Sequence, residues 1–490
     1  MSTLAQSFPL PARTSLASPT AAIEILSLFG AVAVATLVFV FGWITPEQAA
    51  VLTLALLVSL DVLAWKRFDQ GRHPCFLFLS MLTLLQGGRL IAYCAGAEPY
   101  PLRVGSSITN SPFDLSRDEA GMVLLCLALS AICVYTPCRW SYRRFAPPST
   151  ASVRQYLPYL YLLFYGSLPV LILKNYSYYQ YAQEHGGYLS FWVNHGEFAA
   201  TVPLWVRLCS LVSLPAFVGI FVFESRKKWL YLATLCYFGS SLPVLLMGSR
   251  MGIFGLTLAL WYASGIKSVK KSRLVRIVVL AFVVFLGAGM VQALREDSDT
   301  VFSYAVDPFT FVRLAGNSLD VTEVVVKYRP IFSPYAASYL WNELQSGFNP
   351  HDVQHYFRGR ALGHDVTVLL SSSALAQGYG TADSYIAEEY MIGGTVGVAV
   401  ISLLIGLALH LLYHFSRYAI GLFLVLMVLP EFINMPRGDL LDWLSVLARA
   451  FLLVAVLGVG WSVYRVLVWL KQGTRGSPSQ AAISSPLGAP

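Results

Sequence analysis

Residues 390–412, YMIGGTVGVAVISLLIGLALHLL, contain no Asp, Glu, Lys or Arg. A helix needs about 20 mainly apolar residues to cross a bilayer, so this stretch predicts a membrane span. Similar runs recur along the chain, for example at 31–43 and 277–294, and short polar segments separate them. The 490 residues are 56% hydrophobic and only 12% charged, about half the charged share of a soluble domain. The sequence therefore predicts an all-α polytopic membrane protein.

The apolar runs predict about twelve transmembrane helices. They lie at 22–43, 47–65, 75–96, 119–137, 156–174, 201–223, 229–247, 251–266, 277–294, 390–412, 418–434 and 440–468. The domain organisation that follows is an N-terminal tail at 1–20, spans one to nine in 21–294, a large loop at 295–389, spans ten to twelve in 390–470, and a C-terminal tail at 471–490. Both tails are rich in Ser, Pro and Ala, and the C-terminal one also in Gly, a composition typical of disordered segments.

Basic residues concentrate in every second connection between these runs, which is the pattern of loops that face the cytoplasm. The clusters lie at 66–72, 139–154, 226–228, 267–276 and 471–475. This bias predicts that both termini are cytoplasmic and that the loop at 295–389 is periplasmic. The loop contains many aromatic and apolar residues, so we expect it to be folded and partly helical rather than a linker.

Several other classes of protein are not favoured by the sequence. The net charge of +8 comes from loop residues that orient a membrane protein, so we expect no binding to nucleic acid. The seven cysteines lie in or beside apolar runs and are interpreted as small buried residues rather than disulfide or zinc ligands. The run at 21–43 is too long for a secretory signal and lacks a small-residue cleavage site.

Three arginines stand at predicted periplasmic ends of spans. Arg250 lies in a Gly-Ser-Arg-Met-Gly turn, Arg437 lies in a Pro-Arg-Gly-Asp turn, and Arg295 closes the ninth span. Guanidinium groups from distant helix ends suit the binding of a diphosphate, because each stays charged and matches phosphate oxygens with a fork of donors. The alternative interpretations are a snorkelling side chain for Arg250, an ion pair with Asp439 or Asp442 for Arg437, and a helix-end anchor for Arg295.

Acidic and imidazole groups gather late in the predicted loop. Asp383 and Glu388 lie just before the tenth span, where a carboxylate serves either as a general base or as a favourable charge at a helix N-terminus. His364 precedes them. The histidines at 351–355 and the acidic run at 296–299 lack a convincing ligand spacing, so we expect no metal.

The chain resembles the O-antigen polymerase family, including its enterobacterial common antigen branch. The resemblance rests on the Met-Gly-Ser-Arg turn at 247–250, the stretch 383–394 with a further glycine at Gly397, and the turn at 436–439. The plan of many spans with one large periplasmic loop late in the chain is shared with that family and with O-antigen ligases, and is similar to that of GT-C glycosyltransferases. An arginine followed by a glycine eleven positions later, found in some members, is missing from the predicted periplasmic loops at 175–200 and 295–389.

The resemblance implies a glycosyltransferase of the inner membrane, active at the periplasmic face. Its substrate is expected to be an oligosaccharide repeat unit linked to undecaprenyl pyrophosphate, with no cofactor. A hydroxyl of the incoming unit attacks the anomeric carbon of the growing chain, and undecaprenyl pyrophosphate leaves. Arg250, Arg437 and Arg295 are the predicted pyrophosphate ligands, and the predicted general-base candidates are Asp383, Glu388 and His364.

A flippase and a chain-length regulator of the same pathway are the expected partners. Two other functions stay open at this point. An O-antigen ligase uses the same donor but transfers it to lipid A core, and a polysaccharide flippase or other transporter moves lipid-linked units across the membrane. The large predicted loop and the absence of matched interrupted helices in two halves of the sequence disfavour transport.

Overall fold

A computed structural model describes residues 19–104, 113–140, 142–185, 202–247, 251–267, 308–346, 358–376 and 380–448, together with the isolated residues 198, 450, 451, 455, 458, 462 and 466. The regular secondary structure of this part of the chain is helical except for a two-stranded antiparallel ribbon, in which β1 (Arg103–Val104) pairs with β2 (Phe113–Asp114). The prediction of an all-helical membrane fold is confirmed for the described residues.

Eight helical segments of the described chain are long and apolar enough to cross a membrane. They are α1 (Pro19–Val40), α2 (Pro46–Arg67), α5 (Arg117–Trp140), the segment Val153–Glu184 with η1 (Ala151–Tyr156) and α6 (Leu157–Glu184), α9 (Leu204–Phe223), the segment Lys227–Met247 with α10 (Lys227–Ser240) and α11 (Leu242–Met247), α21 (Tyr385–Phe415), and the segment Ala419–Arg437 with α22 (Ala419–Asn434) and η3 (Met435–Arg437).

Two consecutive helices form a ninth candidate span when the bent pair is counted as one span. Helices α3 (Pro74–Leu85) and α4 (Gly88–Cys94) are bent by 58° at the break between them. Helix α12 (Met251–Ile266) contains a shorter apolar segment, Gly252–Ile266. The expected span at 277–294 and most of the one at 440–468 lie outside the described residues. The expected total of about twelve therefore stays a prediction.

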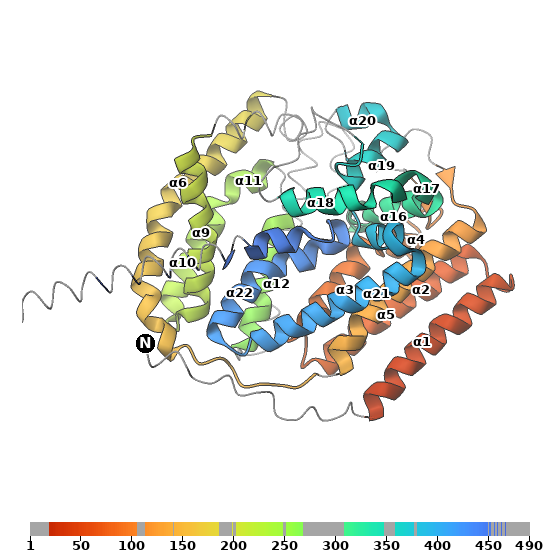
Figure 1. Cartoon of the computed structure of the whole chain (residues 1–490), viewed down its shortest axis with the longest axis horizontal. Coiled ribbons are helices and arrows are strands. Elements are labelled where there is room, and N and C mark those ends of the chain that lie inside the picture. Colours follow the sequence, from red (N-terminus) through yellow and green to blue (C-terminus); the bar gives the residue numbers. More distant parts are fainter. Residues whose placement is uncertain are drawn as a thin grey trace, which may run out of the picture.

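A central group of membrane helices consists of α3, α5, α12, α21 and α22, and the other membrane helices pack around it (Figure 1). Helix α21 runs along α5, α12 packs on α22, and α6 packs on α9. Helix α1 lies at one edge of the molecule, whereas α6, α9 and α10 stand together at the other end. Side chains of the outer helices are exposed, including Leu26 of α1 and Leu162 of α6. Apolar exposure of this kind is expected for helices in contact with lipid.

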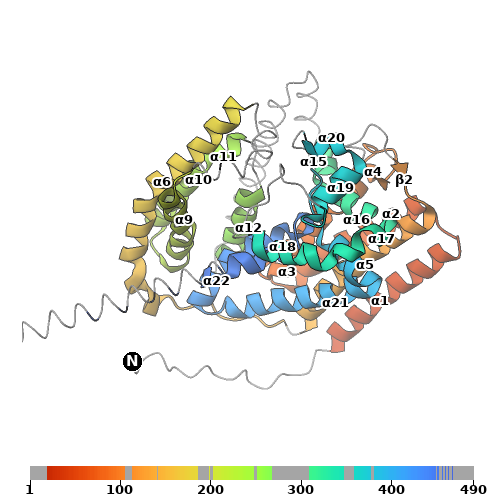
Figure 2. The ribbon, with the colours of Figure 1, turned by 45° about the horizontal axis from the view of Figure 1, so that its top comes forward.

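Short helices form a cap over one end of the central group, and Figure 2 shows them together beside α5 and α21. They are α15 (Pro308–Ala315), α16 (Ser318–Lys327), α17 (Arg329–Phe332), η2 (Ser333–Tyr335), α18 (Ala336–Ser346), α19 (Leu362–Leu370) and α20 (Ser372–Ala376). All of them fall in the interval where the sequence predicts the large loop. Helix α16 is the best anchored, since it packs on both α5 and α21.

A buried ion pair fastens the cap to the bent span. Arg89 of α4 contacts Asp320 at 2.5 Å and Glu323 at 3.1 Å, and all three side chains are inaccessible to solvent. Burial raises the pKa of Glu323 to about 8, although Arg89 opposes this shift. A buried arginine left without its acids would carry a large desolvation cost, so this contact fixes α16 in place.

Candidate active site

Three carboxylates that are far apart in the sequence meet beneath the cap. They belong to Glu343 of α18, Glu388 in the first turns of α21, and Asp439 just after η3. One oxygen of each lies within 4.8 Å of the others. Glu388 is inaccessible to solvent and Glu343 is 4% exposed, whereas Asp439 is half-buried. Because acidic side chains are rarely buried without a partner, this convergence marks a candidate functional site.

Backbone N–H groups after η3 hold the two glutamates. The N–H of Leu440 donates to Oε2 of Glu388 at 3.0 Å, and the N–H of Leu441 donates to Oε2 of Glu343 at 3.0 Å. A hydrogen bond also joins the carboxyl groups of Glu343 and Glu388, which requires a proton on one of them. The segment after Arg437 thus binds both α18 and the start of α21 and holds them together.

The electrostatic environment favours protonation of this cluster. Burial raises the pKa of the Glu343 carboxyl to about 8; the bond from Leu441 opposes the shift, and the charges of Asp383 and Asp442 add to it. Burial also raises the pKa of Asp439 well above its ordinary range, and the surrounding carboxylates raise it further. Carboxyls whose pKa lies near neutrality are suited to exchanging protons with a substrate at working pH.

The general-base candidates from the sequence lie in this neighbourhood. Glu388 is part of the cluster itself. Asp383 accepts a hydrogen bond from the N–H of Gly363, and its charge acts on Glu343, Glu388 and His364. Burial lowers the pKa of His364, although Asp383 acts in the opposite direction, so the imidazole is neutral at pH 7. The structure therefore brings all three predicted residues to one region.

Asp383 lies close to the backbone of α19 at Gly363, and this contact holds it in the region. A Cβ atom at Gly363 would lie 2.7 Å from Oδ1 of Asp383 and 2.8 Å from the carbonyl oxygen of Thr381. Real Cβ contacts do not reach such distances, so only glycine fits here. The first turn of α19 is thereby docked directly against the segment that leads into α21.

A buried glutamine links the break in the α3–α4 span to the same region. Gln86 donates from Nε2 to Oγ of Ser384 at 3.0 Å and to the carbonyl oxygen of Pro436. The Ser384 hydroxyl also lies 2.9 Å from Oγ1 of Thr322 in α16. The bent span, the cap, η3 and the start of α21 therefore meet through one chain of hydrogen bonds, which sets the relative positions of the acidic residues.

The predicted arginines are only partly described. Arg437 is half-buried in η3, two residues before Asp439, whereas Arg250 and Arg295 lie outside the described residues. The start of α12 nevertheless lies beside the Arg437 turn. A Cβ at Gly255 would approach Nδ2 of Asn434 to 2.9 Å and the carbonyl oxygen of Pro430 to 3.1 Å. The first turns of α12 thus pack tightly against the end of α22.

Comparison with known proteins identifies the family. The family described as O-antigen polysaccharide polymerase Wzy matches residues 23–464. The chain belongs to this family. No curated protein and no solved structure gives a match. The resemblance inferred from the sequence is confirmed, and the chain is a multi-pass membrane enzyme that polymerises lipid-linked repeat units in polysaccharide biosynthesis. The family match favours polymerisation over the ligase and flippase alternatives.

Several residues of this candidate site were not predicted from the sequence. Glu343 and Asp439 complete the carboxylate cluster, and Gln86 joins its supporting elements. Glu343 stands alone in a polar stretch of the loop, so no spacing distinguishes it from a solvated acid. Asp439 was considered only as an ion-pair partner of Arg437. For Gln86 the one available signal was its place between two apolar segments. A polar side chain within a membrane span needs a hydrogen-bond partner.

One further cation of the Wzy-family chain lies at a break in α21. Gly393 and Gly394 depart from helical geometry, and Gly394 has a φ of +60°, which favours glycine. The guanidinium of Arg329 lies over the ring of Tyr390 at 5.3 Å, and a Cβ at Gly394 would lie 3.6 Å from its Nη1. Nε of Arg329 is buried and has no hydrogen-bond partner among the described residues.

Proposed function

We propose that the cluster of Glu343, Glu388 and Asp439 is the catalytic centre of this polymerase. The growing chain on undecaprenyl pyrophosphate is the donor, and a hydroxyl of the incoming lipid-linked unit is the acceptor. The acceptor oxygen forms a bond to the anomeric carbon as the bond to the diphosphate oxygen breaks. The hydroxyl proton passes to a carboxylate of the cluster, and undecaprenyl pyrophosphate leaves. The observation that supports this proposal most strongly is the convergence of the three carboxylates.

Glu388 is the proposed base. It lies at the centre of the cluster, and its backbone sits on a membrane helix that supports it more rigidly than a loop. Asp383 already accepts the Gly363 N–H, so its proposed role is to position α19 and to supply negative charge. His364 is a neutral imidazole beside Asp383, which suits a hydrogen bond to a sugar hydroxyl. Glu343 shares a proton with Glu388 and adjusts its basicity.

The departing diphosphate is the proposed ligand of the arginines. Arg437 is two residues from Asp439 of the cluster, and Arg250 directly precedes in sequence α12, whose first turns pack on the end of α22. Arg295 is the third proposed ligand. A fixed guanidinium lowers the barrier by neutralising charge that develops on the leaving oxygen. Arg329, at the α21 break, is a candidate for the diphosphate of the second lipid-linked substrate, because polymerisation brings two such groups to the site.

A divalent cation is the alternative occupant of the carboxylate cluster. We expect that it is not needed, because a shared proton and two backbone N–H groups already compensate the glutamates. Purified enzyme given lipid-linked repeat units in a buffer without divalent cations should form long chains, and added Mg²⁺ or Mn²⁺ should leave the rate unchanged. Extension that starts only after such an ion is added would replace the proposed base with a metal site.

The active site is proposed to face the periplasm, in the inner membrane. The positive-inside bias places the basic segment at 226–228 in the cytoplasm and the cap outside. Alkaline phosphatase fused after Ser372 is therefore expected to be active, and the same fusion after Lys228 should be inactive. The reverse pattern would invert the topology. A periplasmic site would receive its substrate from a flippase, and a chain-length regulator is the other proposed partner.

A further inference from the structure

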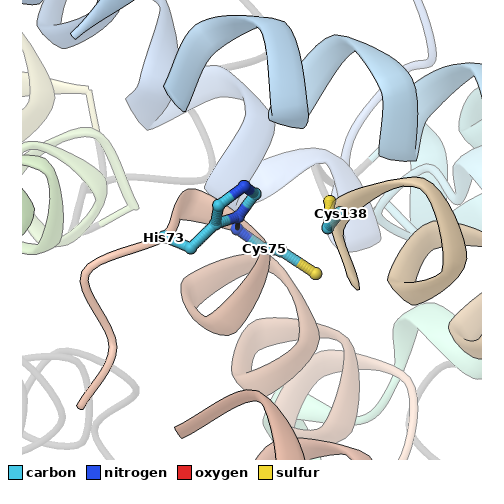
Figure 3. Close-up of side chains that lie close together, drawn as sticks. All are labelled: His73, Cys75 and Cys138. Carbon is cyan, nitrogen blue, oxygen red and sulfur yellow. Dashed lines mark hydrogen bonds between the residues drawn. The ribbon is translucent and has the colours of Figure 1, made fainter. Parts of the chain in front are cut away.

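A second cluster of ligating side chains lies far from the carboxylates. It consists of His73, which precedes α3, Cys75 in the first turn of α3, and Cys138 in the last turn of α5. One ligand atom of each lies within 4.8 Å of the others. All three residues are buried. Figure 3 shows the imidazole and the two sulfur atoms brought together from these separate elements.

This cluster stands at the opposite end of the membrane helices from the proposed catalytic centre. The ring of His73 stacks on that of His410 with the centroids 5.9 Å apart, and His410 is close to the C-terminal end of α21, whereas Glu388 lies near its start. A ligand bound here therefore has no direct contact with the reaction.

Hydrogen bonds with backbone groups hold His73 and Cys138. Nδ1 of His73 accepts a bond from the N–H of Cys75 at 3.1 Å, and the Cys138 thiol donates to the carbonyl oxygen of Gly406 at 3.2 Å. Nε2 of His73 is buried and has no hydrogen-bond partner among the described residues. Buried polar atoms are nearly always paired, so an unpaired imidazole nitrogen is unusual. The ring is thus hydrogen-bonded at one nitrogen only, and the rings of Phe68 and Tyr413 pack against it with centroids 4.7 and 4.6 Å away.

We propose that His73, Cys75 and Cys138 bind a soft transition-metal ion, with zinc as the simplest example. Zinc takes thiolate sulfur at about 2.3 Å and imidazole nitrogen at about 2.0 Å in a tetrahedral arrangement, so neighbouring ligand atoms lie within about 4 Å. The observed spacing needs only a small contraction. Binding forms two metal–sulfur bonds and one metal–nitrogen bond, a water molecule takes the fourth position, and the two thiol protons leave to water. The resulting unit is neutral, which suits a buried site.

Metal binding explains two thiols side by side better than a disulfide does. Basic residues flank the cluster on both sides, at 66–72 and at 139–144. On the proposed topology this end faces the cytoplasm, where thiols stay reduced. The metal would replace the Cys75 cap bond and the thiol bond to Gly406, and would join the start of α3 to the end of α5. Its expected role is to hold these two spans together.

The test is the metal content of the full-length protein purified in detergent. Wild type is expected to hold about one equivalent of zinc by mass spectrometry of the metal, and Co²⁺ added to apoprotein should give a sulfur-to-cobalt charge-transfer band. The variants Cys75→Ser and Cys138→Ser are expected to lose most of both signals. Cys126→Ser and Cys133→Ser are matched controls, because these cysteines are also buried on α5 but lie outside the cluster. They should keep both.

Two results would overturn the proposal. One is a wild-type protein that holds no zinc after incubation with it and gives no cobalt band. The other is a folded Cys138→Ser protein whose metal content equals that of wild type. If the serine variants do not fold, the cobalt titration of wild type decides alone, since it needs no substitution. Polymerase activity does not enter this readout, so its outcome is separate from that of the proposed catalytic centre.

Discussion

Polymerisation is expected to fall by about 10²–10⁴-fold when Glu388 is replaced by glutamine, because the amide cannot take a proton from the acceptor hydroxyl. The change keeps the size of the side chain. Glutamine also keeps an oxygen that accepts the N–H of Leu440, so the fold should be preserved. The measurement is the length distribution of products made by purified enzyme from lipid-linked repeat units, together with the yield of monodisperse protein.

The adjacent residue supplies a matched control. Glu389 is equally buried in α21, but its carboxylate accepts hydrogen bonds from Ser402 at 2.9 and 3.1 Å and does not belong to the cluster. Glu389→Gln can keep an acceptor for the serine, so we expect product lengths close to those of wild type. Equal loss in both variants would indicate that buried charge at this helix stabilises the fold rather than the reaction.

Removal of the Arg437 guanidinium is expected to have the second large effect. Loss of one group that stabilises developing charge typically costs about 10²–10³-fold in rate, and Arg437→Ala should show a loss of this size. Arg437→Lys is expected to restore only part of it, because one ammonium does not reproduce the two-pronged contact with phosphate oxygens. Arg250→Ala and Arg250→Lys should behave in the same way if both arginines hold one diphosphate.

An exposed arginine elsewhere controls for net charge. Arg417 lies between α21 and α22 at the end away from the cluster, and Arg417→Ala should leave chain length unchanged. The rate should be compared at several substrate concentrations, because a residue that holds the leaving group affects the maximal rate as well as binding. Long chains made by both the Arg437→Ala and Arg250→Ala proteins would remove these residues from the site.

The membrane fold was predictable because its signal is local. An apolar run such as 390–412 needs no knowledge of distant contacts to indicate a helix in lipid, since each helix satisfies its own backbone. Breaks inside spans were harder to foresee. The glycines at 393 and 394 are compatible with a continuous helix, and the bend after Leu85 depends on how Gln86 bonds to Ser384 and Pro436.

The site was only partly predictable, for a different physical reason. Asp383 and Glu388 were identifiable because acids at the rim of an apolar run are costly unless something compensates them. Glu343 carries no such signal, since nothing in its own segment shows that α18 folds back onto α21. A cluster built from residues 343, 388 and 439 is a property of the tertiary fold. The three candidate bases could be proposed separately, but their shared environment appears only in three dimensions.

The dependence of rate on pH tests most directly whether the buried carboxylates take the acceptor proton. With the wild-type enzyme, the rate at saturating substrate should rise with pH to a plateau, because Glu388 acts as a base only when it is ionised. The midpoint should lie above the ordinary range of a carboxyl, since Glu388 shares a proton with Glu343, whose pKa burial raises to about 8. In Glu343→Gln the remaining carboxyls lose an acidic neighbour, so this midpoint should move to lower pH. A profile that stays flat from about pH 6 to pH 9 in the wild type, or a midpoint that Glu343→Gln leaves unchanged, would contradict a catalytic role for the cluster.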